Sequence, residues 1–487
     1  MGRGLTNAEF TNGRLRLDQL AVSAPAYRFQ LSGNLTPQQT YPMDIAVQWS
    51  MDGGEFGRLR GQAKLSGDLQ RLTLYHRLTA PVRAELRGTI SDVLTRLSWQ
   101  GELTAPEINL QTLHAQWPAL TLGGTLRGKG DLQRIQAQGE LHSRYQDLRA
   151  DHRFAMVYDD GTLAINRFET TLPQSGAHIE LHGTLTGLAR QPQAAIEGTW
   201  QGLRWPLQGA SQIRSAAGRF SATGTLDHYQ MQVDGDLAGE QLPPGNWSLN
   251  AEGTPQHLTV NELAGRLLGG TLKANGRLDW QPQLHWQTEL HGEGLDPGVQ
   301  WPEWPGRIAF TAHSSGAVSD GAAQLQVVLS QLQGELKSAP IDGEGILNIQ
   351  GDRFDLAKLR IDSGGNHFTA AGSVQDTWNM QWRVTAADLK HLMPGSAGHF
   401  QGSGDISGPR NAPTLTASLA GQQLNIADKH IGEIALVMAV DMEDRVPSTL
   451  ELEAHNATFG DLSVESLRLR GDGTAARRHG CCPFGYQ

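Results

Sequence analysis

The heptapeptide AELRGTI at residues 84–90 returns along the chain as IELHGTL at 179–185, LKANGRL at 272–278 and FTAAGSV at 368–374. The central glycines of these copies lie 95, 93 and 96 residues apart, and a shorter copy, LRG, follows at 469–471. Apolar and polar residues alternate around each glycine, which is the pattern of a β-strand. A fixed spacing of this kind predicts a stacked repeat architecture in which neighbouring units bury one another's faces.

Two further landmarks keep the same period. The first is an apolar residue followed by proline, at intervals of 88, 96 and 92 residues, in Trp117-Pro118, Trp205-Pro206, Trp301-Pro302 and Met393-Pro394. The second is a glycine two residues before an apolar residue, at intervals of 94, 92 and 88 residues, in Gly130-Asp131-Leu132, Gly224-Thr225-Leu226, Gly316-Ala317-Val318 and Gly404-Asp405-Ile406.

Three landmarks in one order allow a division of the chain into repeats of about 95 residues. We expect an entry segment at 1–87, followed by repeat units at 88–182, 183–275, 276–371 and 372–471. Each unit should hold roughly seven to nine short strands. The tail, 472–487, loses the alternation in the stretch AARRHGCCPFGYQ, and we expect it to be unstructured.

Alternation of apolar and polar residues dominates the chain and predicts an all-β fold. The 58 glycines among 487 residues supply turns and permit the bends that a curved sheet requires. An alternating strand gives a sheet one apolar and one polar face. If a long sheet curls and stays open, its apolar face becomes a groove, and the residues expected to line it are Ile45, Val47, Trp49, Leu278, Trp280, Leu284, Trp286, Met380, Trp382 and Val384.

Composition excludes several classes of function. The net charge is -10 and the basic residues never form a run, which argues against a nucleic-acid-binding protein. The N-terminal stretch MGRGLTNAEF has no apolar segment of a signal peptide, and the longest apolar run, 434–440, is too short to cross a bilayer. We therefore expect this chain to be soluble or a piece of a longer protein.

Catalytic and cofactor motifs are missing from the sequence. It contains no HExxH string, no phosphate-binding GxxxxGK loop and no GxSxG elbow. His479, Cys481 and Cys482 form the closest grouping of metal-ligand types, but they lie in the irregular tail. We expect no catalytic residues, no cofactor and no metal site, and so a protein that is not an enzyme.

The glycine-punctuated strings and the recurring polar-Pro-x-apolar stretches, such as QPQAAI at 191–196, QPQLHW at 281–286 and NAPTLT at 411–416, resemble the AsmA-like and TamB family. The resemblance covers about residues 15–471. It implies a long β-sheet folded like a taco around an apolar groove, in a periplasmic protein of the bacterial envelope that is anchored in the inner membrane. The anchor and the partner-docking region of the family are not matched here, so membranes would be reached through regions outside this chain.

The resemblance also implies function and partners. The family assists the assembly of outer-membrane proteins such as autotransporters, together with an outer-membrane partner of the TamA type, and passes phospholipids between membranes. Expected ligands are therefore acyl chains, nascent β-barrel proteins, or both. Two alternatives remain open at this point: a structural or adhesive repeat protein with a sealed core, and a β-rich carbohydrate-active enzyme.

Overall fold

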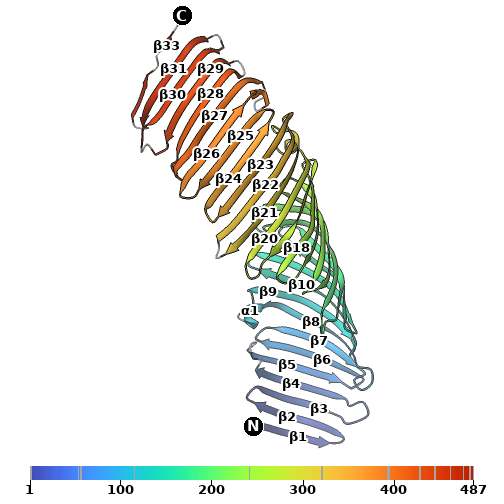
Figure 1. The fold of residues 1–487 in the computed structure, drawn as a ribbon. Helices are drawn as coiled ribbons and strands as arrows, with labels where there is room; N and C mark the ends of the chain where they lie inside the picture. Colours follow the sequence, from blue (N-terminus) through green and yellow to red (C-terminus); the bar gives the residue numbers. More distant parts are fainter. Residues whose placement is uncertain are drawn as a thin grey trace. The chain divides into compact units, whose positions relative to one another are not determined.

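The computed structural model describes residues 3–52, 54, 57–114, 116–240, 242–319, 322–391, 395–426, 429–443, 446–460, 462–474, 477–481 and 484–485. The chain divides into two compact units, residues 1–242 and 243–487. Both are antiparallel sheets in which each strand pairs with the next strand of the chain, except that the final strand, Phe484–Gly485, pairs with the strand Leu462–Thr474 (Figure 1).

The first unit is a meander of sixteen strands. Their bounds are β1 Arg3–Thr11, β2 Arg14–Ala24, β3 Tyr27–Leu35, β4 Met43–Asp52, β5 Arg58–Gly67, β6 Arg71–Ala80, β7 Ala84–Ser91, β8 Ser98–Asn109, β9 Leu120–Gly130, β10 Arg134–Tyr145, β11 Leu148–Asp159, β12 Thr162–Leu172, β13 Ala177–Thr186, β14 Gln193–Trp205, β15 Ile213–Thr225 and β16 Tyr229–Gly239. One turn of helix, α1 (Leu110–Leu113), links β8 to β9.

The second unit continues the same pattern. Its strands are β17 Gly245–Gly253, β18 His257–Leu267, β19 Gly270–Asp279, β20 Leu284–Leu295, β21 Gly306–Ser319, β22 Ala322–Leu336, β23 Ala339–Gln350, β24 Arg353–Ser363, β25 Asn366–Val374, β26 Thr377–Ala386, β27 Ser396–Pro409, β28 Thr414–Ile426, β29 Lys429–Asp441, β30 Ser448–Phe459, β31 Leu462–Thr474, β32 Arg477–Cys481 and β33 Phe484–Gly485. Two short 3₁₀ turns, η2 (Pro297–Val299) and η3 (Leu389–His391), follow β20 and β26.

The repeat landmarks recur at every sixth strand. The motif glycines Gly88, Gly183, Gly276 and Gly372 lie in β7, β13, β19 and β25, and Gly471 lies in β31. The expected seven to nine strands per repeat were wrong, because most strands have ten to fifteen residues and only six fit into one period. The repeat boundaries themselves stay a prediction.

The apolar-Pro landmarks lie in the connections that follow every sixth strand. Trp117 lies between α1 and β9, Trp205 ends β14, and Trp301 follows η2. Trp117, Trp205 and Trp301 are 40%, 62% and 49% exposed. They therefore contribute little to a core. Met393 and Pro394 fall outside the described residues.

β-Bulges shift the strand register at many pairings in both units. In β12/β13, β18/β19 and β24/β25 the shift lies opposite the motif glycines Gly183, Gly276 and Gly372. A Cβ at these glycines would lie 2.1 to 2.2 Å from a carbonyl oxygen of the following strand, so only glycine allows the strands to approach so closely. Bulges bend a sheet and increase its twist. The expected fold, an all-β repeat built on a long curled sheet, is confirmed within each unit.

Buried cores are small and lie toward the strand ends. One cluster joins Ala150, Leu172 and Ala177, and another joins Ala386, Leu389 and Leu424. Among the described residues no large side chain is fully buried. No helix in the described parts of the chain is long and apolar enough to cross a membrane.

The tail differs from expectation. Arg477–Cys481 pairs with β31 over the register Arg470 to Thr474, and Phe484–Gly485 pairs with β31 at Ser466 and Leu467. Regular strands therefore exist in a stretch that we expected to be unstructured. Cys482 lies outside the described residues.

Candidate functional site: an uncovered apolar sheet face

In the first unit, a continuous row of apolar residues and glycines crosses the sheet from β2 to β16. Each member is the direct partner of the next one across the strands. In order, the row is Leu17, Gly33, Ile45, Leu65, Leu74, Gly88, Gly101, Gly128, Ala137, Met156, Ile165, Gly183, Ile196, Ala222 and Met231. Because directly paired residues share a face, these positions lie on one side of the sheet.

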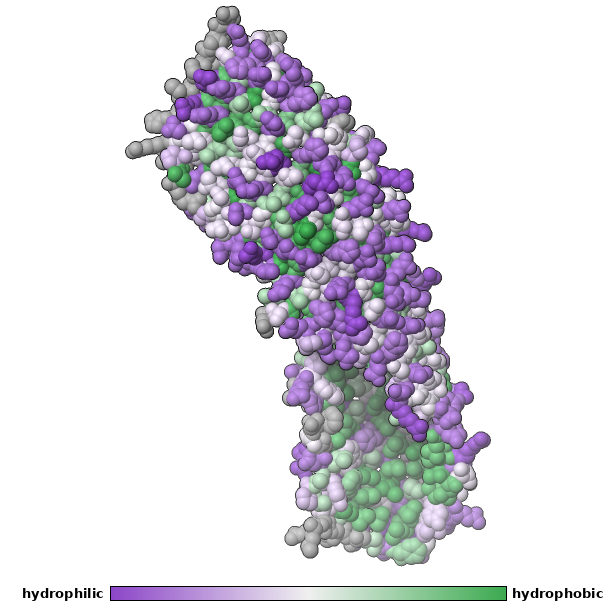
Figure 2. Space-filling view, in the orientation of Figure 1, coloured by the Kyte–Doolittle hydropathy of each residue, from purple (hydrophilic) through white to green (hydrophobic). Residues whose placement is uncertain are grey.

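The adjacent row, one residue along each strand, is mostly polar. From β4 to β10 it reads Asp44, Ser66, Thr73, Thr89, Gln100, Lys129 and Gln136. The first unit therefore has one apolar and one polar face. Figure 2 shows hydrophobic residues gathered in a hollow over the first strands of this unit.

The second unit has an equivalent apolar row. It runs from β17 to β27 through Gly253, Leu258, Leu278, Trp286, Gly316, Leu325, Ile349, Phe354, Val374, Trp378 and Gly408. Most of its large side chains are half-buried, and Phe354 is 37% exposed. The large side chains of this row therefore keep partial contact with solvent.

Nine of the ten predicted groove residues occupy the apolar faces. Ile45, Val47 and Trp49 alternate on β4 with exposed Ala46 and Gln48. Leu278 pairs with Trp286, and Leu284 begins β20 on the same face. Met380, Trp382 and Val384 alternate on β26 with exposed Gln381 and Arg383. Their role as lining of a ligand groove stays a prediction.

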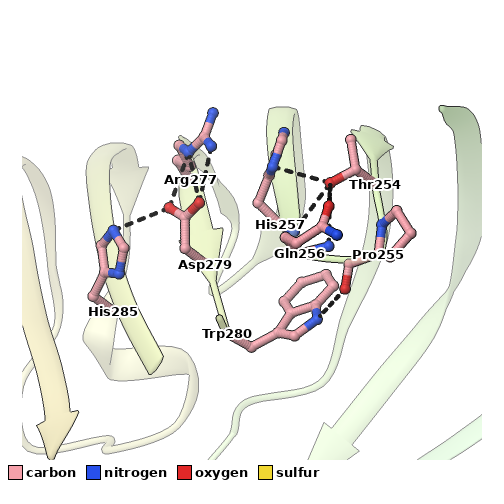
Figure 3. Close-up of polar contacts among 8 residues, drawn as sticks. All are labelled: Thr254, Pro255, Gln256, His257, Arg277, Asp279, Trp280 and His285. Atoms are coloured by element: carbon pink, nitrogen blue, oxygen red, sulfur yellow. Dashed lines mark hydrogen bonds and ion pairs between the residues drawn. The ribbon is translucent and has the colours of Figure 1, made fainter. Parts of the chain in front are cut away.

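Trp280 is placed differently. It follows the last residue of β19, is 37% exposed, and donates its indole N–H to the carbonyl oxygen of Pro255 at 2.7 Å (Figure 3). Its neighbour Asp279 lies on the polar face, where Arg277 donates to it at 2.9 Å and His285 lies 3.2 Å away. The Arg277 hydrogen bonds lower the pKa of the Asp279 carboxyl. Trp280 thus covers a turn at the strand end.

Tryptophans on the apolar faces lie flat against glycines of the next strand. Trp49, Trp200, Trp247, Trp286 and Trp382 are directly paired with glycines, namely Gly61, Gly218, Gly265, Gly316 and Gly404. A Cβ at any of these glycines would lie within 3.0 Å of the indole. The large rings therefore spread over the backbone of the neighbouring strand.

Alternation alone did not single out Trp99, Trp200 and Trp247, although each lies in an alternating strand. The additional signal is the glycine on the next strand, since the ring of Trp99 also covers Gly128. A search for tryptophan followed one hairpin later by glycine would have found them.

Two histidines interrupt the apolar face of the first unit. Trp49 donates its indole N–H to Nε2 of His76 at 3.0 Å. His152 makes hydrogen bonds with the hydroxyls of Ser143 (2.8 Å) and Thr170 (3.0 Å). Burial lowers the pKa of both imidazoles, so both are held in the neutral form near pH 7. Sequence alternation gave no reason to expect polar groups here.

The opposite face carries cross-strand ion pairs. Arg127 donates to Glu102 at 2.7 Å, Arg219 to Asp234 at 3.0 Å, and Arg360 to Glu344 at 3.0 Å. The hydrogen bond that Arg127 donates to Glu102 raises the pKa of Arg127 further. Exposed pairs of this kind add little stability, but they mark this face as the one that stays in water.

The chain matches the family described as "TamB, N-terminal domain" over residues 3–93 and 160–479. It belongs to the TamB family. A curated relative, the translocation and assembly module subunit TamB of Haemophilus influenzae, is 26% identical over 256 residues. That match covers 51% of this chain and 20% of the relative, so this TamB-family chain spans only part of the relative's length.

Proposed function

We propose that this TamB-family chain acts in the bacterial envelope as a non-enzymatic conduit whose apolar face binds phospholipid acyl chains during their passage between membranes. The observation that carries the proposal is the continuous apolar row, which crosses fifteen consecutive strands of the first unit without a charged residue. A sheet has a strand spacing of about 4.8 Å, so this row extends for roughly 65–70 Å.

Energetics favour acyl chains as the ligand. Transfer of each CH₂ group from water to an apolar surface is worth about 0.8 kcal/mol, so a chain of ordinary length gains several kcal/mol along the row. The half-exposed tryptophans that lie flat on glycines provide an apolar surface of aromatic rings along the row. Such a surface suits flexible chains of variable length better than a ligand of fixed shape.

The alternative of a sealed core has less support. In a closed sandwich the tryptophan and leucine side chains of the inner faces would be fully buried, but no large side chain among the described residues is. A non-enzymatic role agrees with the sequence, which contains none of the catalytic motifs sought.

The relative's name, a translocation and assembly module subunit, supports a second cargo for the same face. An unfolded β-strand of an outer-membrane protein also has one apolar side, and the apolar row could shield it until insertion. In this role the chain would act with an outer-membrane partner of the TamA type, and the full-length protein would be periplasmic and anchored in the inner membrane.

Site-specific photo-crosslinking tests the lipid proposal. A photoreactive amino acid is placed at Val47 and Trp382 on the apolar faces, and at the adjacent outward positions Gln48 and Gln381 as matched controls. The purified chain is incubated with phospholipid vesicles and irradiated. We expect phospholipid adducts at Val47 and Trp382 only. Equal labelling of all four positions, or no labelling of a folded chain, would reject the proposal.

A further inference from the structure

The polar face of the first unit holds a compact group of three potential metal ligands. Glu169 of β12 is directly paired with Glu180 of β13, and His178 precedes Glu180 by two residues on the same face. One ligand atom from each of these three side chains lies within 4.8 Å of the others. None of them belongs to the apolar face, so this group has no part in the proposed lipid conduit.

Electrostatics make this arrangement unusual. Like charges directly opposite each other on neighbouring strands are destabilising. Glu169 is moreover only 8% exposed, which reduces its contact with water. Arg167 forms an ion pair with Glu169 and its charge also acts on Glu180, but its side chain is 55% exposed, so solvent screens part of that charge. A bound cation between the two carboxylates would offset their repulsion directly.

The surroundings orient the ligands as outer-shell residues do in metal sites. The hydroxyl of Thr171 lies 3.2 Å from Nδ1 of His178, which leaves Nε2 to coordinate an ion. Arg167 similarly donates to one carboxylate oxygen of Glu169, Oε1. Partners of this kind set the ring orientation and tautomer of a ligating histidine.

We propose that Glu169, His178 and Glu180 form a binding site for a divalent transition-metal ion, with Zn²⁺ the best match. One imidazole and two carboxylates suit zinc, whereas calcium and magnesium prefer oxygen ligands alone. Three protein ligands leave a coordination position for water. The ion ties β12 to β13 beside the bulge at Ile165 and Phe168, where the ladder between these strands is interrupted.

Titration of the purified chain with Zn²⁺ by calorimetry tests the site, and Co²⁺ absorption reports its coordination. We expect one saturable site and a tetrahedral Co²⁺ spectrum. His178→Ala and Glu180→Gln should weaken binding by more than tenfold, and Thr171→Val by about tenfold, since losing an outer-shell partner typically costs 10–100-fold. Circular dichroism confirms that each variant is folded.

The matched control is His182→Ala. His182 lies on the same strand and the same face, but its nearest acidic partner is Glu197, at 3.7 Å. Its removal should leave affinity and the Co²⁺ spectrum unchanged. The proposal is overturned if the chain shows no saturable site, if His178→Ala and Glu180→Gln bind as tightly as the parent, or if His182→Ala loses binding to the same extent. Lipid crosslinking at Val47 is independent of every one of these results.

Discussion

Trp200 of β14 and Gly218 of β15 are directly paired, and the indole lies so close over the glycine that a Cβ there would lie 2.0 Å from Cζ2. The same ring carbon lies 2.7 Å from a Cβ position at Gly235 of β16. The indole N–H donates to the hydroxyl of Ser215 at 2.7 Å. One tryptophan thus covers the backbone of two neighbouring strands with its polar atom satisfied.

Gly218→Ala should therefore destabilise the chain, because the methyl group displaces the indole from its place on the sheet. Overpacking of this kind typically costs about 1–3 kcal/mol, which chemical denaturation measures as a lower free energy of unfolding. Gly345→Ala in β23 is the control, since its Cβ would meet a flexible methyl of Leu359 at 3.3 Å and the carbonyl oxygen of Lys358 at an ordinary 3.5 Å. In a Trp200→Leu background, Gly218→Ala should lower the free energy of unfolding by much less. Equal costs in both backgrounds would show that the ring is not responsible.

This relationship explains which parts of the fold the sequence could predict. Alternation and glycine spacing were sufficient for the strand class, the repeat and the apolar face, because a period of two fixes which side chains share a face. The partner of a given residue depends on hairpin register and bulges, which the local pattern does not encode. The pairing of Trp200 with Gly218 was therefore not predicted, and Trp280 was placed on the groove although its strand ends at Asp279.

Asp236 stabilises the bulge between β15 and β16. Its two carboxylate oxygens accept hydrogen bonds from the backbone N–H groups of Ala217 (2.6 Å) and Ala216 (2.8 Å), which the register shift leaves without partners in β16. Partial burial opposes the charged form, but the backbone hydrogen bonds outweigh it and lower the pKa of Asp236.

We predict that Asp236→Asn lowers the free energy of unfolding by about 1–3 kcal/mol, because an amide accepts one of these bonds and turns a donor toward the other. Asp234→Asn on the same strand breaks only an exposed ion pair with Arg219 and should cost less than about 1 kcal/mol. Since the pKa of Asp236 is lowered from 3.8, its contribution is present above that pH and is lost as the pH falls through the folded-state pKa. Similar losses in both variants would contradict this assignment.

The half-buried histidines His76 and His152 give the first unit a second, milder acid sensitivity. His76 and His152 have pKa values below the ordinary 6.5, so the unfolded chain binds protons more readily than the folded chain does. The contribution of the two histidines to stability is therefore fully present above pH 6.5 and decreases as the pH falls toward their lower folded-state pKa values. Replacing both histidines by glutamine should make the melting temperature depend less on pH between pH 6.5 and the lower folded-state pKa values. The exposed His182→Gln should keep the parent's pH dependence, and an unchanged slope in the double variant would reject the explanation.

Substitutions by aspartate on β26 distinguish an open apolar face from a core. Trp382 is half-buried, and its indole lies over Gly404 and near Gly402 of the next strand. Trp382→Asp should leave a cooperative thermal transition, because water can solvate the carboxylate on an uncovered face. Ala386→Asp is the matched control four residues on, where the side chain is 1% exposed in a packed cluster and an unpaired charge costs several kcal/mol. We predict that Ala386→Asp abolishes cooperative melting of the second unit, whereas Trp382→Asp lowers the melting temperature modestly and reduces lipid labelling from a probe at Met380. Loss of cooperative melting in both variants would mean that Trp382 belongs to a sealed core.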